Sequence, residues 1–425
     1  MKVTYYVNAM MLIEGTRSRV LCDPWISFDN ESESGLYNFP APRTSRADIA
    51  AIRPDFIYIT HTHADHLDPA TLALFDRDTP ILVSWYEDNF TERAMRRLGF
   101  RDVRVADRMA GLTLNGDDTA WLEPSAVYPD VDSIGVFRID GKVLVNANDN
   151  PFHDRQCRSI RERFGPIEVA AVPIGLQGPY PMFYDNLTPA EKVCKAEEKK
   201  QKSYQSIVGY VTTLEPRFLF CFAAGAIYGG PKARMLRYAG IGRADEAIRI
   251  AQAARPVKPV LLSQGCSYDF DTDAQIGTYR PADADSEADY VETIAALPSK
   301  FDESGTFYIA PDERIDLTKL LRAARAKQRL WQERRGVGSD MTYFLDVGEP
   351  RLYRLSMRDD DVYRTARPER DDEPYEIFRL PYSLLVGLLT EHYNWSNVKT
   401  QFVDFYRQPD MFDPELHILM SHLHI

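Results

Sequence analysis

Short apolar runs alternate with turn residues along the first part of the chain. The segments DFIYIT (55–60), VDSIGVFRI (131–139) and PRFLFCF (216–222) have the length, composition and bounding turn residues of strands. Helical patterns lie between such runs, as in DPATLALF (68–75), where Asp68 is the expected N-cap in front of a proline. This mixture of strands and helices predicts an α/β fold.

The clearest helix signal is the segment 187–211, in which Thr188 and Glu191 form a capping box. The last fifty residues have the spacing of amphipathic helices with a narrow apolar stripe. We therefore expect a domain of strands and helices over residues 1–270 and a mixed, mainly helical extension over residues 271–425 that packs on the same core.

Composition limits the class of protein. With 425 residues, 44% of them hydrophobic, and no apolar run long enough to span a bilayer, the chain is typical of a globular enzyme that does not enter a membrane. Its net charge of −12 disfavours nucleic-acid binding but allows a small anionic ligand held by local basic groups. The opening segment carries no secretory signal, which predicts a cytoplasmic location.

The 5 cysteines are scattered along the chain, with no C-x-x-C and no C-x-H pair. This spacing encodes neither a disulfide framework nor a cysteine-ligated zinc or Rieske cluster. We expect reduced thiols, most of them buried.

The segment YITHTHADHLDP (58–69) holds three of the chain's 8 histidines. His61 and His63 follow a predicted strand, and residues two apart in an extended segment face the same way, so both rings can bind one metal ion. Asp65 and His66 then face the other way and can serve a second ion, as a two-metal site requires. A surface cluster of histidines is the alternative, but such spacing favours metal binding.

A two-metal site also needs a carboxylate that bridges the ions. Asp149 follows the apolar run KVLVN (142–146), and an acid that emerges from a buried strand is costly unless a cation lies nearby. An ordinary turn aspartate is the alternative for the segment NDNP. We expect Asp149 to be the shared ligand.

These motifs together resemble the metallo-β-lactamase fold, in the stretches IEGTRSRVLCDPW, THTHADHLDPATL and DGKVLVNAND. Longer stretches, among them GPYPMFYDNLTPAEK and EPRFLFCFAAG, resemble the lactamase-like part of the CMP-N-acetylneuraminate hydroxylase family nearly end to end. The resemblance implies a four-layer αβ/βα sandwich, an α-helical C-terminal extension and a metalloenzyme.

The chain departs from the usual ligand pattern of that fold at two places. Tyr128 stands where a third histidine normally completes the first metal's ligands, and it is either a ligand that indicates iron or a neighbour that leaves the position open. No histidine lies between His153 and His392, so the usual last ligand of the second metal is missing. His153 and His422 are candidate replacements, and Asp23 is expected to orient a metal-binding histidine.

Three functions remain open from the sequence. The first is a non-haem iron oxygenase acting on a sugar or nucleotide sugar, with one or two ions and electrons from a separate donor, because the Rieske spacing is missing. The second is a metallo-hydrolase with zinc or manganese and a metal-activated water. The third is a binding protein with a degenerate site. The expected catalytic residues are Asp65 and Tyr128, and the expected substrate contacts are Tyr184, Lys232 and Arg234.

Overall fold

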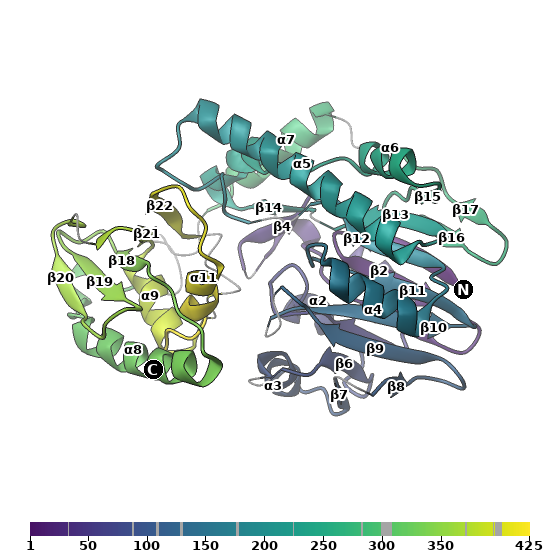
Figure 1. Cartoon of the computed structure of the whole chain (residues 1–425), viewed down its shortest axis with the longest axis horizontal. Helices are drawn as coiled ribbons and strands as arrows, with labels where there is room; N and C mark the ends of the chain where they lie inside the picture. Colours follow the sequence, from purple (N-terminus) through teal and green to yellow (C-terminus); the bar gives the residue numbers. More distant parts are fainter. Residues whose placement is uncertain are drawn as a thin grey trace. The chain divides into compact units, whose positions relative to one another are not determined.

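The computed structural model describes residues 1–32, 34–86, 89–107, 110–127, 131–175, 178–223, 225–281, 284–298, 308–369, 372–393, 395 and 402–425. The chain forms two compact units, which Figure 1 traces by colour along the sequence. The first unit comprises Met1–Gln177, Lys195–Tyr228 and Gly240–Ile294, and the second comprises Gly178–Cys194, Gly229–Ala239 and Ala295–Ile425.

An eight-stranded mixed sheet of order β17-β16-β1-β2-β3-β5-β6-β7 makes one layer of the first unit. Its strands are β1 (Lys2–Val7), β2 (Met10–Glu14), β3 (Arg19–Cys22), β5 (Phe56–Ile59), β6 (Ile81–Ser84), β7 (Val103–Ala106), β16 (Ser267–Asp269) and β17 (Ala274–Ile276). The neighbours from β3 to β7 are parallel, as expected for strands joined through helices.

A seven-stranded sheet of order β15-β13-β12-β11-β10-β9-β8 makes the second layer. Its strands are β8 (Leu112–Thr113), β9 (Thr119–Pro124), β10 (Ser133–Ile139), β11 (Lys142–Asn146), β12 (Val169–Pro173), β13 (Phe218–Phe222) and β15 (Lys258–Val260). A small antiparallel pair, β4 (Leu36–Asn38) and β14 (Ala226–Tyr228), lies apart from both sheets.

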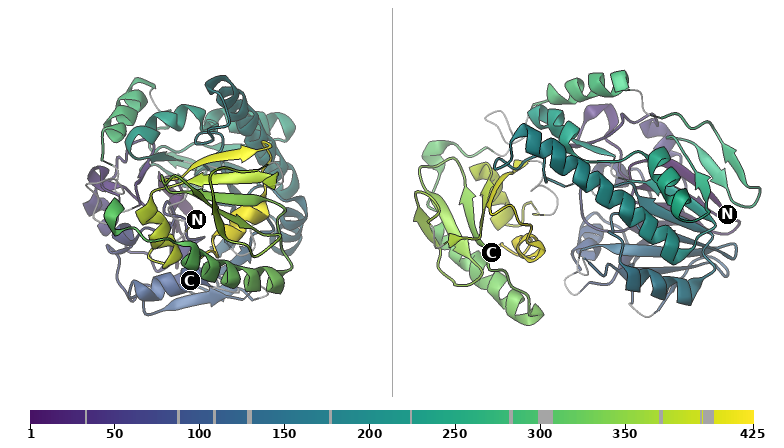
Figure 2. Two further views of the ribbon diagram at one scale, coloured as in Figure 1. Left: turned by 90° about the vertical axis from the view of Figure 1, so that its left-hand side faces the viewer. Right: turned by 45° about the horizontal axis from the view of Figure 1, so that its top comes forward.

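Helices cover the outer face of each large sheet. They are α1 (Arg46–Ala50), α2 (Pro69–Leu72), α3 (Phe90–Arg97), α4 (Asp154–Phe164), α5 (Pro189–Leu214) and α6 (Ala244–Ala254), with the short 3-10 helix η1 (Phe28–Asn30). A further helix, α7 (Ala284–Ala295), ends this unit. The first three helices pack on the eight-stranded sheet, whereas α4, α5 and α6 pack on the seven-stranded sheet, as Figures 1 and 2 show for α4 and α5.

The packing of single strands shows why the apolar runs are continuous. In β5, Phe56 and Tyr58 belong to the core between the two sheets, while Ile57 and Ile59 belong to the core beneath the helices. A strand covered on both faces needs apolar residues at every position. The first unit is therefore the four-layer αβ/βα sandwich that the sequence predicts.

The predicted helix ends are also confirmed. The Asp68 side chain accepts a hydrogen bond from the backbone N–H of Thr71 at the start of α2. At the start of α5, the Thr188 hydroxyl accepts from the N–H of Glu191 at 3.3 Å, and the Glu191 carboxylate accepts from the N–H of Thr188 at 2.7 Å. These caps satisfy backbone groups that the helices themselves leave unpaired.

The second unit is less helical than the sequence indicates. It contains a five-stranded sheet of order β20-β19-β18-β21-β22. Its strands are β18 (Thr342–Asp346), β19 (Leu352–Ser356), β20 (Tyr363–Thr365), β21 (Tyr375–Arg379) and β22 (Asp404–Gln408), and its helices are α8 (Thr318–Arg335), α9 (Tyr382–Leu389), α11 (Pro414–Met420), η2 (Gly230–Tyr238) and η3 (Pro311–Glu313).

All five strands of this sheet lie in the extension expected to be mainly helical. In both β21 and β22, buried and less buried residues alternate with a period of two. Their pairing, with β21 parallel to β18, joins residues far apart in the sequence, which local periodicity cannot show. The boundary also differs from the expected division at residue 270, because the first unit continues to Ile294.

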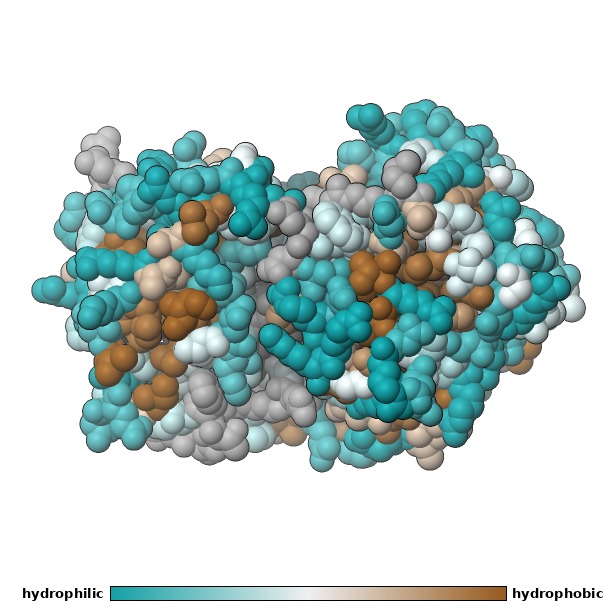
Figure 3. Space-filling view, turned by 90° about the horizontal axis from the view of Figure 1, so that it is seen from below, coloured by the Kyte–Doolittle hydropathy of each residue, from teal (hydrophilic) through white to brown (hydrophobic). Residues whose placement is uncertain are grey.

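The surface agrees with the polar composition. On the face drawn in Figure 3, most described side chains are hydrophilic, and apolar groups form smaller patches among them. Among the helices of the described ranges, none combines the length and the apolar content needed to cross a bilayer.

Candidate metal centre

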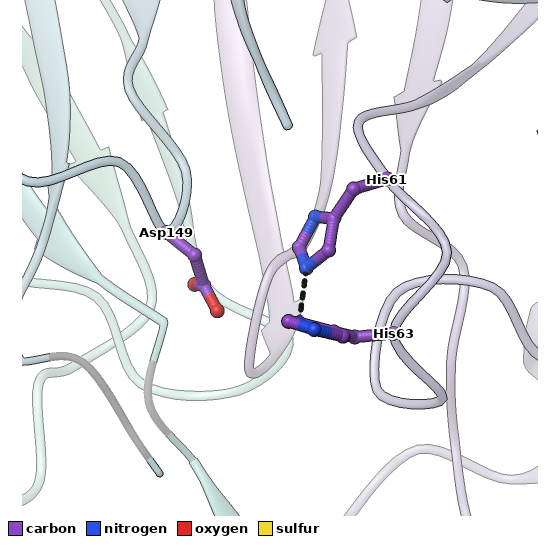
Figure 4. A group of neighbouring side chains, drawn as sticks. All are labelled: His61, His63 and Asp149. Carbon is purple, nitrogen blue, oxygen red and sulfur yellow. Dashed lines mark hydrogen bonds between the residues drawn. The ribbon is translucent and has the colours of Figure 1, made fainter. Parts of the chain in front are cut away.

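The candidate metal ligands come from the two large sheets. His61, His63, Asp65 and His66 follow the carboxyl end of β5, and Asp149 follows the carboxyl end of β11. In Figure 4 the Asp149 carboxylate points toward the two imidazole rings from the opposite side. The sandwich thus brings together residues that lie more than eighty positions apart in the sequence.

The first group consists of His61, His63 and Asp149, whose ligand atoms all lie within 4.8 Å of one another. Nε2 of His61 lies 2.7 Å from Nδ1 of His63 (Figure 4), and His61 is fully buried. Two imidazole nitrogens and one carboxylate on one side of a metal form the ligand set of many non-haem iron oxygenases.

The second group consists of Asp65, His66 and again Asp149, with ligand atoms within the same 4.8 Å. Nε2 of His66 lies 3.5 Å from Asp65 Oδ2 and 3.4 Å from Asp149 Oδ2. Among the described residues, this buried nitrogen has no hydrogen-bond partner. The His66 nitrogen faces two carboxylates without a hydrogen bond to either of them. This is the arrangement expected when all three groups bind one cation, so these residues suit a metal ion.

Asp23 contacts the opposite nitrogen of His66. Its Oδ2 lies 3.0 Å from His66 Nδ1, and its carboxylate accepts hydrogen bonds from the Thr60 N–H at 2.9 Å and the Thr60 hydroxyl at 2.8 Å. Such a carboxylate keeps the proton on Nδ1 and leaves Nε2 free to bind a metal. The geometry suits the orienting role that we predict for Asp23.

The ionisable groups of the centre shift one another's pKa values. Burial lowers the pKa of His61 well below its ordinary value, and the neighbouring His66 and His63 add to this effect. Burial also lowers the pKa of His66, but Asp65 and Asp149 outweigh burial and hold it well above the usual range. Burial raises the pKa of Asp65, but His66 brings it down to about 2. The carboxylates of Asp65 and Asp149 thus favour a positive charge at His66. A metal ion bound there would displace the proton on His66 Nε2.

Two further residues of the candidate centre were not predicted from the sequence. Asn8, in the turn between β1 and β2, donates from Nδ2 to the backbone oxygen of Asp65 at 3.1 Å and to its Oδ2 at 3.3 Å. Its own Oδ1 accepts from the Gly225 N–H at 2.8 Å. An asparagine in a turn is a weak signal, because turn asparagines are common. The other residue, Asp132, lies behind His61 at 3.4 Å from Nδ1.

The remaining candidate ligands have other contacts. His153 is the N-cap of α4, where its Nδ1 accepts from the Gln156 N–H at 3.3 Å, and it is not part of either ligand group. His422 belongs to the second unit, where its ring stacks on Trp331 with 3.9 Å between ring centroids.

The expected substrate contacts all belong to the second unit. Tyr184 is buried, and its hydroxyl donates to Glu376 at 2.9 Å. Lys232 pairs with Asp404 at 2.9 Å. Arg234, in η2, is also engaged by neighbouring groups. The polar groups of Tyr184 and Lys232 already have protein partners, so any contact with substrate would have to share them.

Tyr128 lies outside the described residues, and its role stays a prediction. We expect Tyr128→Phe to preserve metal content while changing turnover, because we predict a tyrosine that lies beside the metal and leaves a coordination position open. Metal analysis, steady-state kinetics and visible absorption of the iron-loaded protein would test this. A coloured ferric form that loses its colour in Tyr128→Phe would show instead that the phenolate binds the metal.

Comparison with known proteins places these observations in context. No protein-family model matches the chain. The chain is 25% identical over 243 residues to a Mycolicibacterium smegmatis protein described as a Rieske 2Fe-2S iron-sulfur protein. The matched region covers 56% of this chain and 46% of that protein. It thus spans about half the length of that relative.

Two other relatives carry enzyme names. A metal-dependent hydrolase of Pyrococcus furiosus is 28% identical over 185 residues, 41% of this chain and 72% of the hydrolase. The cytidine monophosphate-N-acetylneuraminic acid hydroxylase of Asterias rubens is 22% identical over 152 residues, 35% of this chain and 23% of the hydroxylase.

Solved structures match at lower identity. Igni18, a metallo hydrolase from Ignicoccus hospitalis, aligns with a TM-score of 0.46 and 17% identity over 63% of this chain and 98% of its own. CmlA, a diiron β-hydroxylase from Streptomyces venezuelae, aligns with a TM-score of 0.43 and 19% identity. The alignment covers 61% of this chain and 52% of CmlA. The two packed sheets of the first unit, each covered by helices, form the αβ/βα sandwich expected from the resemblance to the metallo-β-lactamase fold.

Proposed function

We propose that this chain is an iron-dependent oxygenase that hydroxylates a sugar or nucleotide sugar. The observation that carries the proposal is the His61–His63–Asp149 group, because two histidines and one carboxylate are the ligand set typical of non-haem iron oxygenases. The similarity to a hydroxylase of a nucleotide sugar supports the substrate class. Iron held there would supply the redox chemistry that inserts oxygen from dioxygen.

The protein's own residues would have distinct tasks in this reaction. His61, His63 and Asp149 would hold one ion, and Asp65 and His66 would complete the site of a second ion. The partly exposed Asp65 is held by Asn8 and is our candidate for proton transfer with the substrate. These 425 residues hold no cysteine spacing of a Rieske cluster, so the electrons would come from a donor outside this stretch of sequence.

A metallo-hydrolase is the second candidate. The Pyrococcus furiosus relative is named a metal-dependent hydrolase, and the match covers 72% of its length. Two ions sharing Asp149 would also suit hydrolysis of a lactone, amide or phosphodiester, in which bound metal lowers the pKa of water to about 7. A binding protein with a degenerate site is the third candidate and requires that the purified chain contain no metal.

The two enzyme functions predict different results with the same protein. We expect the chain, loaded anaerobically with ferrous iron and given a chemical reductant, to consume dioxygen only when a CMP-activated sugar is added, and to form a product 16 mass units heavier by addition of one oxygen atom. Oxygen electrode traces and mass spectrometry of the product provide the measurement.

The zinc-loaded chain is the matched control in this experiment. It should consume no dioxygen, because zinc has no redox chemistry. Zinc-dependent hydrolysis of ester, lactone or phosphodiester substrates, together with no substrate-dependent oxygen consumption by the iron form, would favour the hydrolase. Absence of bound iron and zinc after loading would favour the binding protein.

A further inference from the structure

Asp132, which directly precedes β10, is a buried acid with no role in the ligand groups described above. Its side chain is only 4% exposed. The next residue, Ser133, donates from its hydroxyl to the backbone oxygen of Thr60 at 2.9 Å and lies 2.8 Å from the Tyr58 hydroxyl. These bonds tie the start of β10 to the end of β5, so Asp132 is held directly behind His61.

Three groups surround Nδ1 of His61, the nitrogen that faces away from the metal ligands. Thr60 Oγ1 lies at 2.9 Å, Asn148 Nδ2 at 3.2 Å and Asp132 Oδ1 at 3.4 Å. Thr60 Oγ1 can accept a hydrogen bond from a proton on Nδ1, because the Thr60 hydroxyl donates its own hydrogen to Asp23. The Asp132 carboxylate makes an ion-pair contact and favours a proton on Nδ1 through its charge. The Asn148 amide is a donor, so it can bond Nδ1 only when the ring proton is on Nε2.

The two tautomers of His61 therefore have opposite consequences. With the proton on Nδ1, Nε2 has a free lone pair and can bind a metal ion. With the proton on Nε2, that nitrogen cannot be a ligand. Asp132 opposes the second tautomer in two ways, since its carboxylate favours a proton on Nδ1 and also accepts a hydrogen bond from Asn148 Nδ2 at 3.1 Å.

We propose that Asp132 is a positioning residue that keeps His61 in the tautomer able to bind a metal and so sets the affinity of the His61–His63–Asp149 group. Asp23 has the same relation to His66 in the other group, at 3.0 Å from its Nδ1. Two separate carboxylates thus control two separate ions. The inference rests on the metal centre proposed above and deepens it.

The test compares the 425-residue chain with its Asp132→Asn variant. Nitrogen-proton NMR of the imidazole rings, recorded after chelation and dialysis, reports which nitrogen of His61 carries the proton. Calorimetric titration with Zn²⁺ reports the affinity of each ion, and a His63→Ala variant identifies the ion of the first group. In Asp132→Asn we expect the His61 proton to move toward Nε2, and the first group to lose about 10- to 100-fold in affinity while the second keeps its own.

Two further variants make the result specific. Asp23→Asn should weaken the second ion more than the first, because Asp23 contacts His66 directly and reaches His61 only through Thr60. Adding Asn148→Gly to Asp132→Asn removes the competing donor and should restore much of the affinity; the backbone φ of +49° at position 148 suits glycine. Wild-type tautomer and wild-type affinities in Asp132→Asn would overturn the proposal.

The wild-type chain also provides a test that does not depend on folding of the variant. A proton found on Nε2 of His61 after chelation would overturn the proposal even if Asp132→Asn failed to fold. Failure of the wild-type chain to bind Zn²⁺ would instead refute the proposed metal centre, and the tautomer measurement would still decide the role of Asp132.

Discussion

Replacing Asp149 with asparagine should remove both metal ions and abolish activity. Asp149 is the one residue shared by the two ligand groups, so its loss takes the anionic donor from each of them. We expect each affinity to fall by at least about 100-fold, beyond the usual 10- to 100-fold effect of losing a group that only supports a ligand. Metal analysis after gel filtration and calorimetric titration would measure this effect.

The stability of Asp149→Asn should depend on metal. With a chelator present, we expect its free energy of unfolding to lie within about 1 kcal/mol of wild type, because Asp149 is partly exposed and its charge attracts His66 but repels Asp132. With metal added, wild type alone should be stabilised, by about 2.7 kcal/mol at a metal concentration 100 times the dissociation constant.

A nearby exposed aspartate serves as the control for this experiment. Asp154, at the start of α4, pairs with Arg158 at the surface, so Asp154→Asn should keep both ions. Unchanged metal affinity in Asp149→Asn would mean that Asp149 is an ordinary turn residue and that the shared-ligand assignment is wrong.

His63→Ala should reduce the bound metal from two ions to one. Its ring nitrogen lies 2.7 Å from that of His61, and both belong to the first ligand group only. His63 is less buried than His61, so we expect a small effect on the unfolding temperature measured with a chelator present. Metal analysis would show one ion per chain, and oxygen consumption or hydrolysis should fall to background.

His153→Asn is the matched control for His63→Ala. Asparagine can replace His153 as the N-cap of α4, and His153 lies in neither ligand group, so this variant should keep full metal content. Loss of metal from His153→Asn would restore His153 as a ligand, whereas full occupancy in His63→Ala would remove His63 from the centre.

The sequence alone predicted the local part of this candidate centre. His61, His63, Asp65 and His66 lie within six residues, and the period of an extended chain decides which of them can face one ion. The sandwich itself was expected from the resemblance to the metallo-β-lactamase fold, whereas the apolar runs indicated the strands, since strands covered on both faces cannot alternate with polar residues. Both inferences depend only on neighbours in the sequence, which is why local pattern was sufficient.

The tertiary structure alone decided which distant residues complete the centre. The contacts of Asn8 with Asp65 and of Asp132 with His61 join segments 57 and 71 positions apart, and neither residue stands in a recognisable motif. The sheet of the second unit was hidden for the same reason, because β18 pairs with β21, whose residues lie 33 positions further along the chain (Thr342 beside Tyr375). Such contacts arise when the chain folds back on itself, and no short window of sequence contains both partners.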